Sequence, residues 1–238
     1  MTSMKQERAL FISAPVNALV EGLYRENTKV SDILLQGDFG LGTFNDLDGE
    51  MVVMDGQVYQ LRSDGKAYHV TLDTLTPFAC VTFFKPYSFE EIDSAMDYAE
   101  LLALFDRLLP SKNMVYAIRL DGLFDYVRTR SVPRQEAYKP LVEVTREQPE
   151  YEFEHVAGSM VGFWTPHFIQ SIAVPGYHLH FLTDDKQHGG HLLECRPRHV
   201  KISLHHIDRL QLDLPLTLDY MTADLERDTS ADLREAEH

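Results

Sequence analysis

The sequence predicts an α+β protein of two β-rich domains, with mixed and antiparallel sheet, one long helix and several short ones. Asp-Gly pairs, which are typical of hairpin turns, separate short runs rich in β-branched and aromatic residues. One segment has the apolar spacing of an amphipathic helix, and the second half of the chain again consists mainly of strand-like runs. Segment 140–154 is acidic and interrupted by Pro149, so we expect an N-terminal domain at 1–140 and a C-terminal domain with an acidic tail at 141–238.

The chain is expected to begin with a short helix and to continue into strands. Residues 13–24 place apolar side chains at helical spacing, with Ser13 as the cap and Pro15 in the first turn. Residues 51–70 contain two Asp-Gly pairs between β-prone runs, which predicts a three-stranded meander. Residues 78–84 are expected to form a further buried strand.

The middle of the chain carries the strongest helix pattern. Ser88 and Glu91 have the spacing of a capping box, and apolar residues then recur every three or four positions from Ile92 until Pro110. The sequence therefore predicts one long helix over 88–109.

Strand signals resume after this helix. Residues 114–120 and 123–132 flank the pair Asp121 and Gly122, which predicts another hairpin. Residues 177–182 are expected to form a strand of the second domain.

Composition limits the classes of function. Hydrophobic residues make up 44% of the chain and charged residues 25%, as is typical of a folded globular protein. The formal net charge of -15 argues against nucleic acid and membrane surfaces as partners, because both need clustered Lys and Arg, and it favours a small molecule. The sequence shows neither the apolar core of a signal peptide nor a run long enough for a membrane span, which predicts a cytoplasmic protein. Cys80 and Cys195 lie in apolar runs and are expected to be buried thiols.

A group of histidines provides the main indication of chemistry. On a strand over 177–182, His178 and His180 would share one face about 6.6 Å apart, because side chains alternate with a period of two. The following segment contains two Asp and a Gly-Gly pair and predicts a turn, after which His191 opens the returning strand. Three imidazoles could therefore hold one zinc ion and leave a coordination position open, as in catalytic zinc sites.

Other interpretations of these histidines remain open. The chain has eleven histidines, so an H-x-H pair can arise by chance, and a histidine on a strand is commonly only a hydrogen-bonded polar residue. His188 in the turn could replace His191, although a strand position is held more rigidly. His205 and His206 are adjacent and would point to opposite faces, so we interpret both as structural.

Acid–base and anion-binding partners for a metal are less clearly marked. Glu50 is a carboxylate at the start of an apolar strand, although an exposed glutamate at a strand end is the more common situation. Arg128 and Arg130 share one face of the strand 123–132, where a guanidinium could bind a carboxylate through two hydrogen bonds. Both arginines could equally be surface charges.

The sequence resembles the acetolactate decarboxylase family over most of its length. Three blocks carry the resemblance in the family's order, and they read GDFGLGTFNDLDGEMVVMDGQVYQL (37–61), RTRSVPRQ (128–135) and GYHLHFLTDDKQHGGHLL (176–193). The resemblance implies two β-rich domains whose sheets face one another across the active site, and a homodimer. It also implies zinc-dependent decarboxylation of 2-acetolactate to acetoin and carbon dioxide, in acetoin and butanediol biosynthesis.

The resemblance further implies roles for individual residues. These are the zinc ligands His178, His180, His191 and Glu237, the catalytic residues Glu50 and Arg130, and the pocket-wall residue Thr43. Arg130 is implied rather than Arg128, and Glu235 is an alternative to Glu237. Within this hypothesis Arg130 orients the departing carboxylate and Glu50 handles proton transfer, with Arg130 or a bound water as alternative proton donors.

Two other functions are kept as alternatives. The pattern P-G-x-H-x-H with a later histidine is also typical of cupin-like metal oxygenases, which would bind iron and consume oxygen. A β-rich protein without enzymatic activity could instead hold a structural zinc, and it would unfold when the metal is removed.

Overall fold

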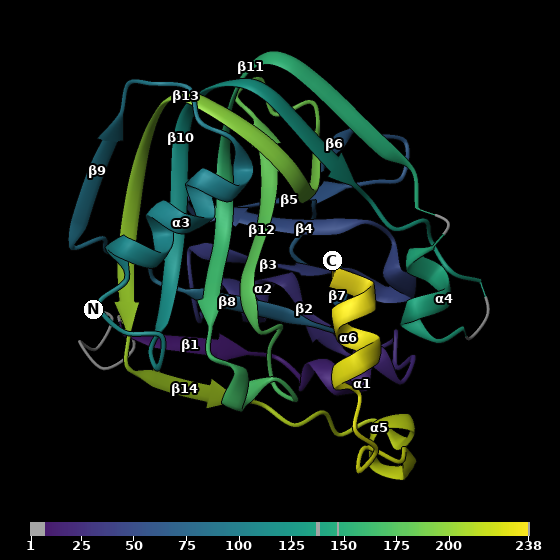
Figure 1. Ribbon diagram of the computed structural model, residues 1–238. Coiled ribbons are helices and arrows are strands. Elements are labelled where there is room, and N and C mark those ends of the chain that lie inside the picture. Colours follow the sequence, from purple (N-terminus) through teal and green to yellow (C-terminus); the bar gives the residue numbers. More distant parts are fainter. Residues whose placement is uncertain (1–7, 137–138, 147, 238) are drawn as a thin grey trace.

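Two β-sheets that face one another dominate the computed structural model, which describes residues 8–136, 139–146 and 148–237 (Figure 1). The first sheet is mixed, because β14 runs parallel to β1 while the other neighbouring strands are antiparallel. In order across the sheet its strands are β14 (Arg209–Leu212), β1 (Ala9–Ile12), β8 (Ala79–Thr82), β3 (Phe39–Thr43), β4 (Glu50–Met54), β5 (Gln57–Leu61) and β6 (Ala67–His69).

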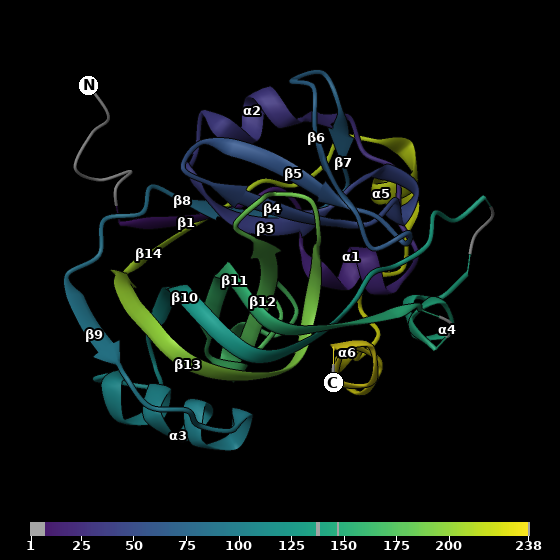
Figure 2. The same ribbon diagram turned by 90° about the horizontal axis from the view of Figure 1, so that it is seen from above.

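The second sheet is antiparallel, and four of its strands close into a ring that Figure 2 shows from above. The ring closes because β10 pairs with β11 on one side and with β13 on the other, and β9 extends the sheet beyond β13. The strands are β10 (Val115–Arg130), β11 (Glu150–Thr165), β12 (Gly176–Thr183), β13 (Gly189–Ile207) and β9 (Ser88–Ile92). Apart from both sheets, β2 (Thr28–Lys29) pairs with β7 (Leu75–Thr76).

The helices are short, and none within the described residues is long and apolar enough to cross a membrane. Helix α6 lies against α1 and α4, beside the two sheets (Figure 1). The helices are α1 (Val16–Val20), α2 (Val30–Leu34), α3 (Tyr98–Leu108), α4 (Leu141–Thr145), α5 (Leu218–Thr222) and α6 (Ser230–Glu237), with 3-10 turns η1 (Asn45–Leu47) and η2 (His167–Ile169).

The apolar core between the sheets provides the frame of the molecule. Leu41 and Val52 of the first sheet belong to the same buried cluster as Val161 and Leu182 of the second. Burying each such side chain fully is worth about 1.5–3 kcal/mol, so the facing strands are held firmly together. Side chains at the ends of these strands are therefore supported from both sheets.

The predicted α+β class with mixed and antiparallel sheet is confirmed, but the sheets do not follow the predicted division of the chain. β10 precedes residue 140 and belongs to the second sheet, whereas β14 follows residue 140 and belongs to the first. Strand pairing therefore crosses the expected boundary in both directions. The division into domains at 1–140 and 141–238 stays a prediction.

The predicted long helix over 88–109 is wrong in its first half. Residues Ser88–Ile92 form β9, because they pair with β13 at the edge of the second sheet. The capping box lies nine residues later than Ser88, at Asp97, whose carboxylate accepts a hydrogen bond from the backbone N–H of Glu100 while the Glu100 carboxylate accepts one from Asp97. The helix therefore spans only Tyr98–Leu108.

The other sequence-based expectations for elements had mixed outcomes. The meander is confirmed as β4, β5 and β6, and the buried strand as β8. The hairpin at Asp121 and Gly122 is wrong, because β10 runs through both residues without a turn. A Cβ atom at Gly122 would lie 2.1 Å from the carbonyl oxygen of His199, so this glycine permits close strand approach.

In the first helix Ser13 is not the cap, because its hydroxyl accepts a hydrogen bond from the backbone N–H of Ala79.

Candidate metal centre

Two neighbouring strands of the second sheet bring three histidines together. His178 and His180 lie on β12, and His191 on β13 is the direct cross-strand partner of His180. The ring centroids lie 5.1 Å apart for His178 and His180, 5.0 Å for His178 and His191, and 5.4 Å for His180 and His191. One nitrogen atom from each ring lies within 4.8 Å of the other two, so the three can share one metal ion.

The side chains of β12 alternate between the two faces of the strand, as predicted. Leu179 and Phe181 point into the buried cluster of the second sheet, whereas Leu182 joins the core between the sheets, on the side of the histidines. Close strand approach keeps β12 in register, because a Cβ atom at Gly162 of β11 would lie 2.0 Å from the carbonyl oxygen of His178. The backbone therefore fixes the direction in which the histidines point.

His180 has the hydrogen bonding of a metal ligand. It is only 1% exposed, and its Nδ1 lies 2.9 Å from the carbonyl oxygen of Met51, which can accept a hydrogen bond from that nitrogen. The proton then resides on Nδ1 and leaves a lone pair on Nε2, which is buried and has no hydrogen-bond partner among the described residues. Ligating histidines commonly donate their second ring N–H to a carbonyl in this way, so these residues fit a metal ion.

Burial and nearby positive charge keep His180 neutral. The pKa of His180 lies well below its usual value, first because burial disfavours the charged ring and then because His178 and Arg130 repel a positive charge. The hydrogen bond to the Met51 carbonyl opposes this shift. A neutral imidazole is the form that binds a metal.

Glu50 and Thr43 reach the same place from the first sheet. Glu50 begins β4 and pairs across the ladder with Thr43, the last residue of β3. The Glu50 Oε2 atom lies 3.7 Å from Nε2 of His180. The buried Thr43 hydroxyl donates a 2.8 Å hydrogen bond to the carbonyl oxygen of Gly49, which fixes the turn that delivers Glu50.

Of the two candidate arginines, Arg130 adjoins the histidines. It ends β10 next to His191 in the strand register, and its charge contributes to the lowered pKa of His180. Arg128 lies two residues earlier and pairs instead with Glu150 at 3.0 Å and Glu194 at 3.4 Å. The half-buried Arg130 side chain is therefore the one available beside the histidine cluster.

The C-terminal helix α6 packs close to Arg130. One Nη atom of Arg130 donates a hydrogen bond to the carbonyl oxygen of Ala236. Glu235 is turned to the surface and pairs with Arg146 at 2.6 Å, so it does not reach the histidines. The side chain of Glu237, the expected fourth ligand, lies outside the described residues.

Three other histidines that the sequence singled out, and both cysteines, have structural positions. The Nδ1 atom of His188 lies 2.9 Å from the carbonyl oxygen of Gly65, and this histidine is not part of the cluster. His205 accepts a hydrogen bond from the backbone N–H of Lys85, and His206 stacks on Tyr116. Both cysteines are buried, and burial raises the pKa of each thiol.

Comparison with known proteins assigns this arrangement to a family. The family model for alpha-acetolactate decarboxylase matches residues 10–227. This chain belongs to the alpha-acetolactate decarboxylase family. It is 41% identical to the alpha-acetolactate decarboxylase of Methylococcus capsulatus over 98% of this chain and 90% of that protein. The crystal structure of alpha-acetolactate decarboxylase from Bacillus subtilis strain 168 superposes with a TM-score of 0.93 at 38% identity, covering 96% of this chain and 99% of that one.

In this member of the alpha-acetolactate decarboxylase family, a small cavity of about 40 Å³ lies beside His178 and His191. Glu50, Thr43 and the apolar side chains of Val16, Leu19, Phe78 and Val174 line the rest of it. This apolar wall could not be predicted from the sequence, because α1, Phe78 and Val174 are far apart along the chain. The Met51 carbonyl was also missed, since a backbone atom has no signature in the sequence.

Proposed function

We propose that this protein decarboxylates 2-acetolactate to acetoin and carbon dioxide, with a zinc ion held by His178, His180 and His191. Membership of the alpha-acetolactate decarboxylase family makes the chain a carboxy-lyase. The observation that carries the zinc proposal is the buried Nε2 atom of His180, which has no hydrogen-bond partner among the described residues and lies beside two further imidazoles. Three nitrogen ligands leave a position open for an oxygen-bearing substrate.

The reaction breaks the bond between C2 and the carboxylate of 2-acetolactate. The electron pair of that bond is taken up through the adjacent ketone, and a proton is then returned to C2 to give acetoin. A bound zinc ion would supply the Lewis acidity that stabilises negative charge on the ketone oxygen.

Arg130 is proposed to bind and orient the carboxylate that leaves. Its guanidinium can donate two parallel hydrogen bonds to a carboxylate, and its position beside His191 places the positive charge next to the proposed metal site. The hydrogen bond to Ala236 holds this flexible side chain in place.

Glu50 is proposed to move the proton. Its carboxylate lies 3.7 Å from Nε2 of His180 and lines the cavity. Its cross-strand partner Thr43 lines the same cavity. A positioned carboxylate can transfer a proton to the carbon that carries the electron pair. Glu237 as a fourth ligand, the homodimer and the cytoplasmic location stay predictions.

The test is anaerobic incubation of the purified protein with 2-acetolactate, combined with metal analysis. We expect equal amounts of acetoin and carbon dioxide and about one zinc per chain. A chelator should abolish turnover while the circular dichroism spectrum is retained, and added zinc should restore turnover. Oxygen-dependent turnover with bound iron would instead indicate a cupin-like oxygenase. Unfolding on chelation, without any turnover, would indicate a structural zinc.

A further inference from the structure

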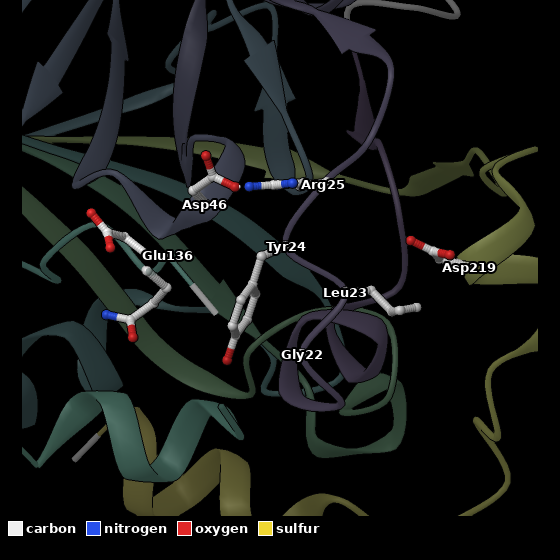
Figure 3. Close-up of a pocket in the computed structure, with 8 residues that line it drawn as sticks. Gly22, Leu23, Tyr24, Arg25, Asp46, Glu136 and Asp219 are labelled. Atoms are coloured by element: carbon white, nitrogen blue, oxygen red, sulfur yellow. The ribbon is translucent and has the colours of Figure 1, made fainter. Parts of the chain in front are cut away.

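The connection between β3 and β4 contains an aspartate that bonds to two other segments of the chain. Asp46 lies three residues after Thr43 and four before Glu50, and it is 9% exposed. Its carboxylate accepts hydrogen bonds from Nε of Arg25 and, at 2.8 Å, from an Nη atom of Arg134. Figure 3 shows the Arg25 guanidinium and the Asp46 carboxylate directed at one another.

The backbone of Asp46 joins the same two segments. Its N–H donates a 2.8 Å hydrogen bond to the carbonyl oxygen of Tyr24, and its carbonyl oxygen accepts a 2.7 Å bond from the N–H of Gln135. Residue 46 is therefore bonded through backbone and side chain to segments 24–25 and 134–135. A cavity of about 210 Å³ lies over this junction (Figure 3).

Each of the three joined segments leads along the chain to a residue that lines the cavity of the proposed active site or to Arg130. Segment 24–25 follows α1, which supplies Leu19 to the cavity. Segment 134–135 follows Arg130 by four residues, and the loop of Asp46 itself connects Thr43 to Glu50. The junction lies where these segments meet, at the ends of the strands that carry the reacting side chains.

The backbone conformation and the charge of Asp46 both indicate that surrounding contacts hold this residue in one position. Asp46 has a φ of +64° and the following Leu47 a φ of +51°, in the left-handed region that non-glycine residues adopt rarely. Such conformations persist only where surrounding bonds hold them, and they are concentrated at functional sites. Burial alone would raise the pKa of Asp46, but the hydrogen bonds and charges of Arg25 and Arg134 lower it, so the residue is a carboxylate at neutral pH.

We propose that Asp46 is a positioning residue for the decarboxylation, and that it fixes where Glu50 and Arg130 lie without touching the substrate itself. This inference rests on the roles proposed above for those two residues. The metal-binding histidines do not depend on it in the same way, because they are held by the pairing of β12 with β11 and β13. Loss of Asp46 should therefore separate catalysis from metal binding.

The test compares two substitutions of Asp46 with a control in the same loop. Asp46→Ala should lower kcat about tenfold or more, because small misplacements of reacting groups are costly, whereas zinc per chain should stay at the wild-type value. Asp46→Asn retains an acceptor oxygen and tolerates the left-handed conformation, so it should lose only about threefold. Asp48→Asn is the matched control, because Asp48 also pairs with an arginine, Arg62 at 3.1 Å, and does not line the cavity at the junction. We expect its kcat to stay within about twofold of wild type, as for most surface changes.

A double-mutant cycle distinguishes positioning from a general loss of stability. If Asp46 acts through Glu50, then Asp46→Ala should lower kcat much less in a Glu50→Gln background than in the wild type. Hydrogen exchange should also become faster in residues 131–135 of Asp46→Ala, while β12 exchanges as before. Full kcat in Asp46→Ala would overturn the proposal, as would an equal loss in both backgrounds. Failure of the decarboxylase proposal itself would be seen separately, as wild-type protein that makes no acetoin.

Discussion

The two sides of the proposed active site are built in different ways. The histidine side comes from adjacent strands joined by one short turn, so that His178 and His191 are only 13 residues apart in the chain (191 − 178). The opposite side is formed by Glu50 and Arg130, which are 80 residues apart in the chain (130 − 50) and lie on different sheets. A local hairpin can therefore build the metal-binding half, whereas the acid–base half exists only after the two sheets have packed together.

The difference also concerns what holds each side. His180 and His191 lie inside their strands and pair with a neighbouring strand on both sides, so the ladder continues past each of them. Glu50 and Arg130 are also paired with neighbouring strands, but each is the terminal residue of its strand, so the adjoining loops and Ala236 of α6 add to its support. Substitutions on the histidine side should thus remove metal and activity together, and those on the other side should remove activity alone.

The largest expected effect is from His180→Ala. Loss of one of three nitrogen ligands should leave little bound zinc, and losing several kcal/mol of Lewis-acid stabilisation corresponds to at least about a thousandfold lower kcat. Elemental analysis and acetoin formation measure the two effects. His188→Ala is the control, because that ring is directed at Gly65. A His180→Ala protein with normal zinc and turnover would refute the metal site.

Arg130→Ala should have the next largest effect, and it should lower activity without loss of zinc, unlike a change on the histidine side. Losing a charged donor to a reacting carboxylate should lower kcat/KM about a hundredfold, while zinc per chain stays unchanged. Arg128→Ala should change kcat/KM by less than about threefold, since Arg128 pairs with surface glutamates and such pairs contribute little. Equal losses in the two variants would show that the carboxylate is bound by the other arginine or by both.

The histidine side should also make the metal-free protein sensitive to acid. The folded chain holds the pKa of His180 below the ordinary 6.5, so below about pH 6.5 the unfolded chain binds a proton that the folded chain does not. Stability from this group is thus present at neutral pH and is lost as the pH falls, until the lowered pKa of the folded state is reached. The expected slope is up to about 1.4 kcal/mol per pH unit, or tenfold in the folding equilibrium.

Urea unfolding of the metal-free protein between pH 7 and pH 5.5 measures this slope. The variant His180→Asn should show a smaller slope than the wild type, because it lacks the buried titrating ring. Identical slopes in the two proteins would mean that His180 does not control the acid response.

The same contrast explains what the sequence could and could not predict. His178, His180 and His191 follow from strand alternation and one turn, both of which are local, and the three rings do come together. Nothing local distinguishes Glu50 and Arg130 from exposed charges at strand ends, so family resemblance rather than spacing selected them. The helix expected from residue 88 failed for a related reason, since pairing with β13 is a long-range interaction that overrides the local pattern at Ser88–Ile92.

The smallest expected effect is from Thr43→Val, which tests how far the acid–base side depends on single hydrogen bonds. The Thr43 hydroxyl is buried and bonded to the Gly49 carbonyl, so a shape-conserving valine should cost about 1 kcal/mol of stability by urea unfolding. Because Gly49 directly precedes Glu50, kcat should fall a few fold while zinc is retained. Thr43→Ser keeps the hydroxyl and should recover most of that kcat. If the serine variant is impaired and the valine variant is not, the methyl group rather than the hydrogen bond matters, and Thr43 then acts as part of the cavity wall.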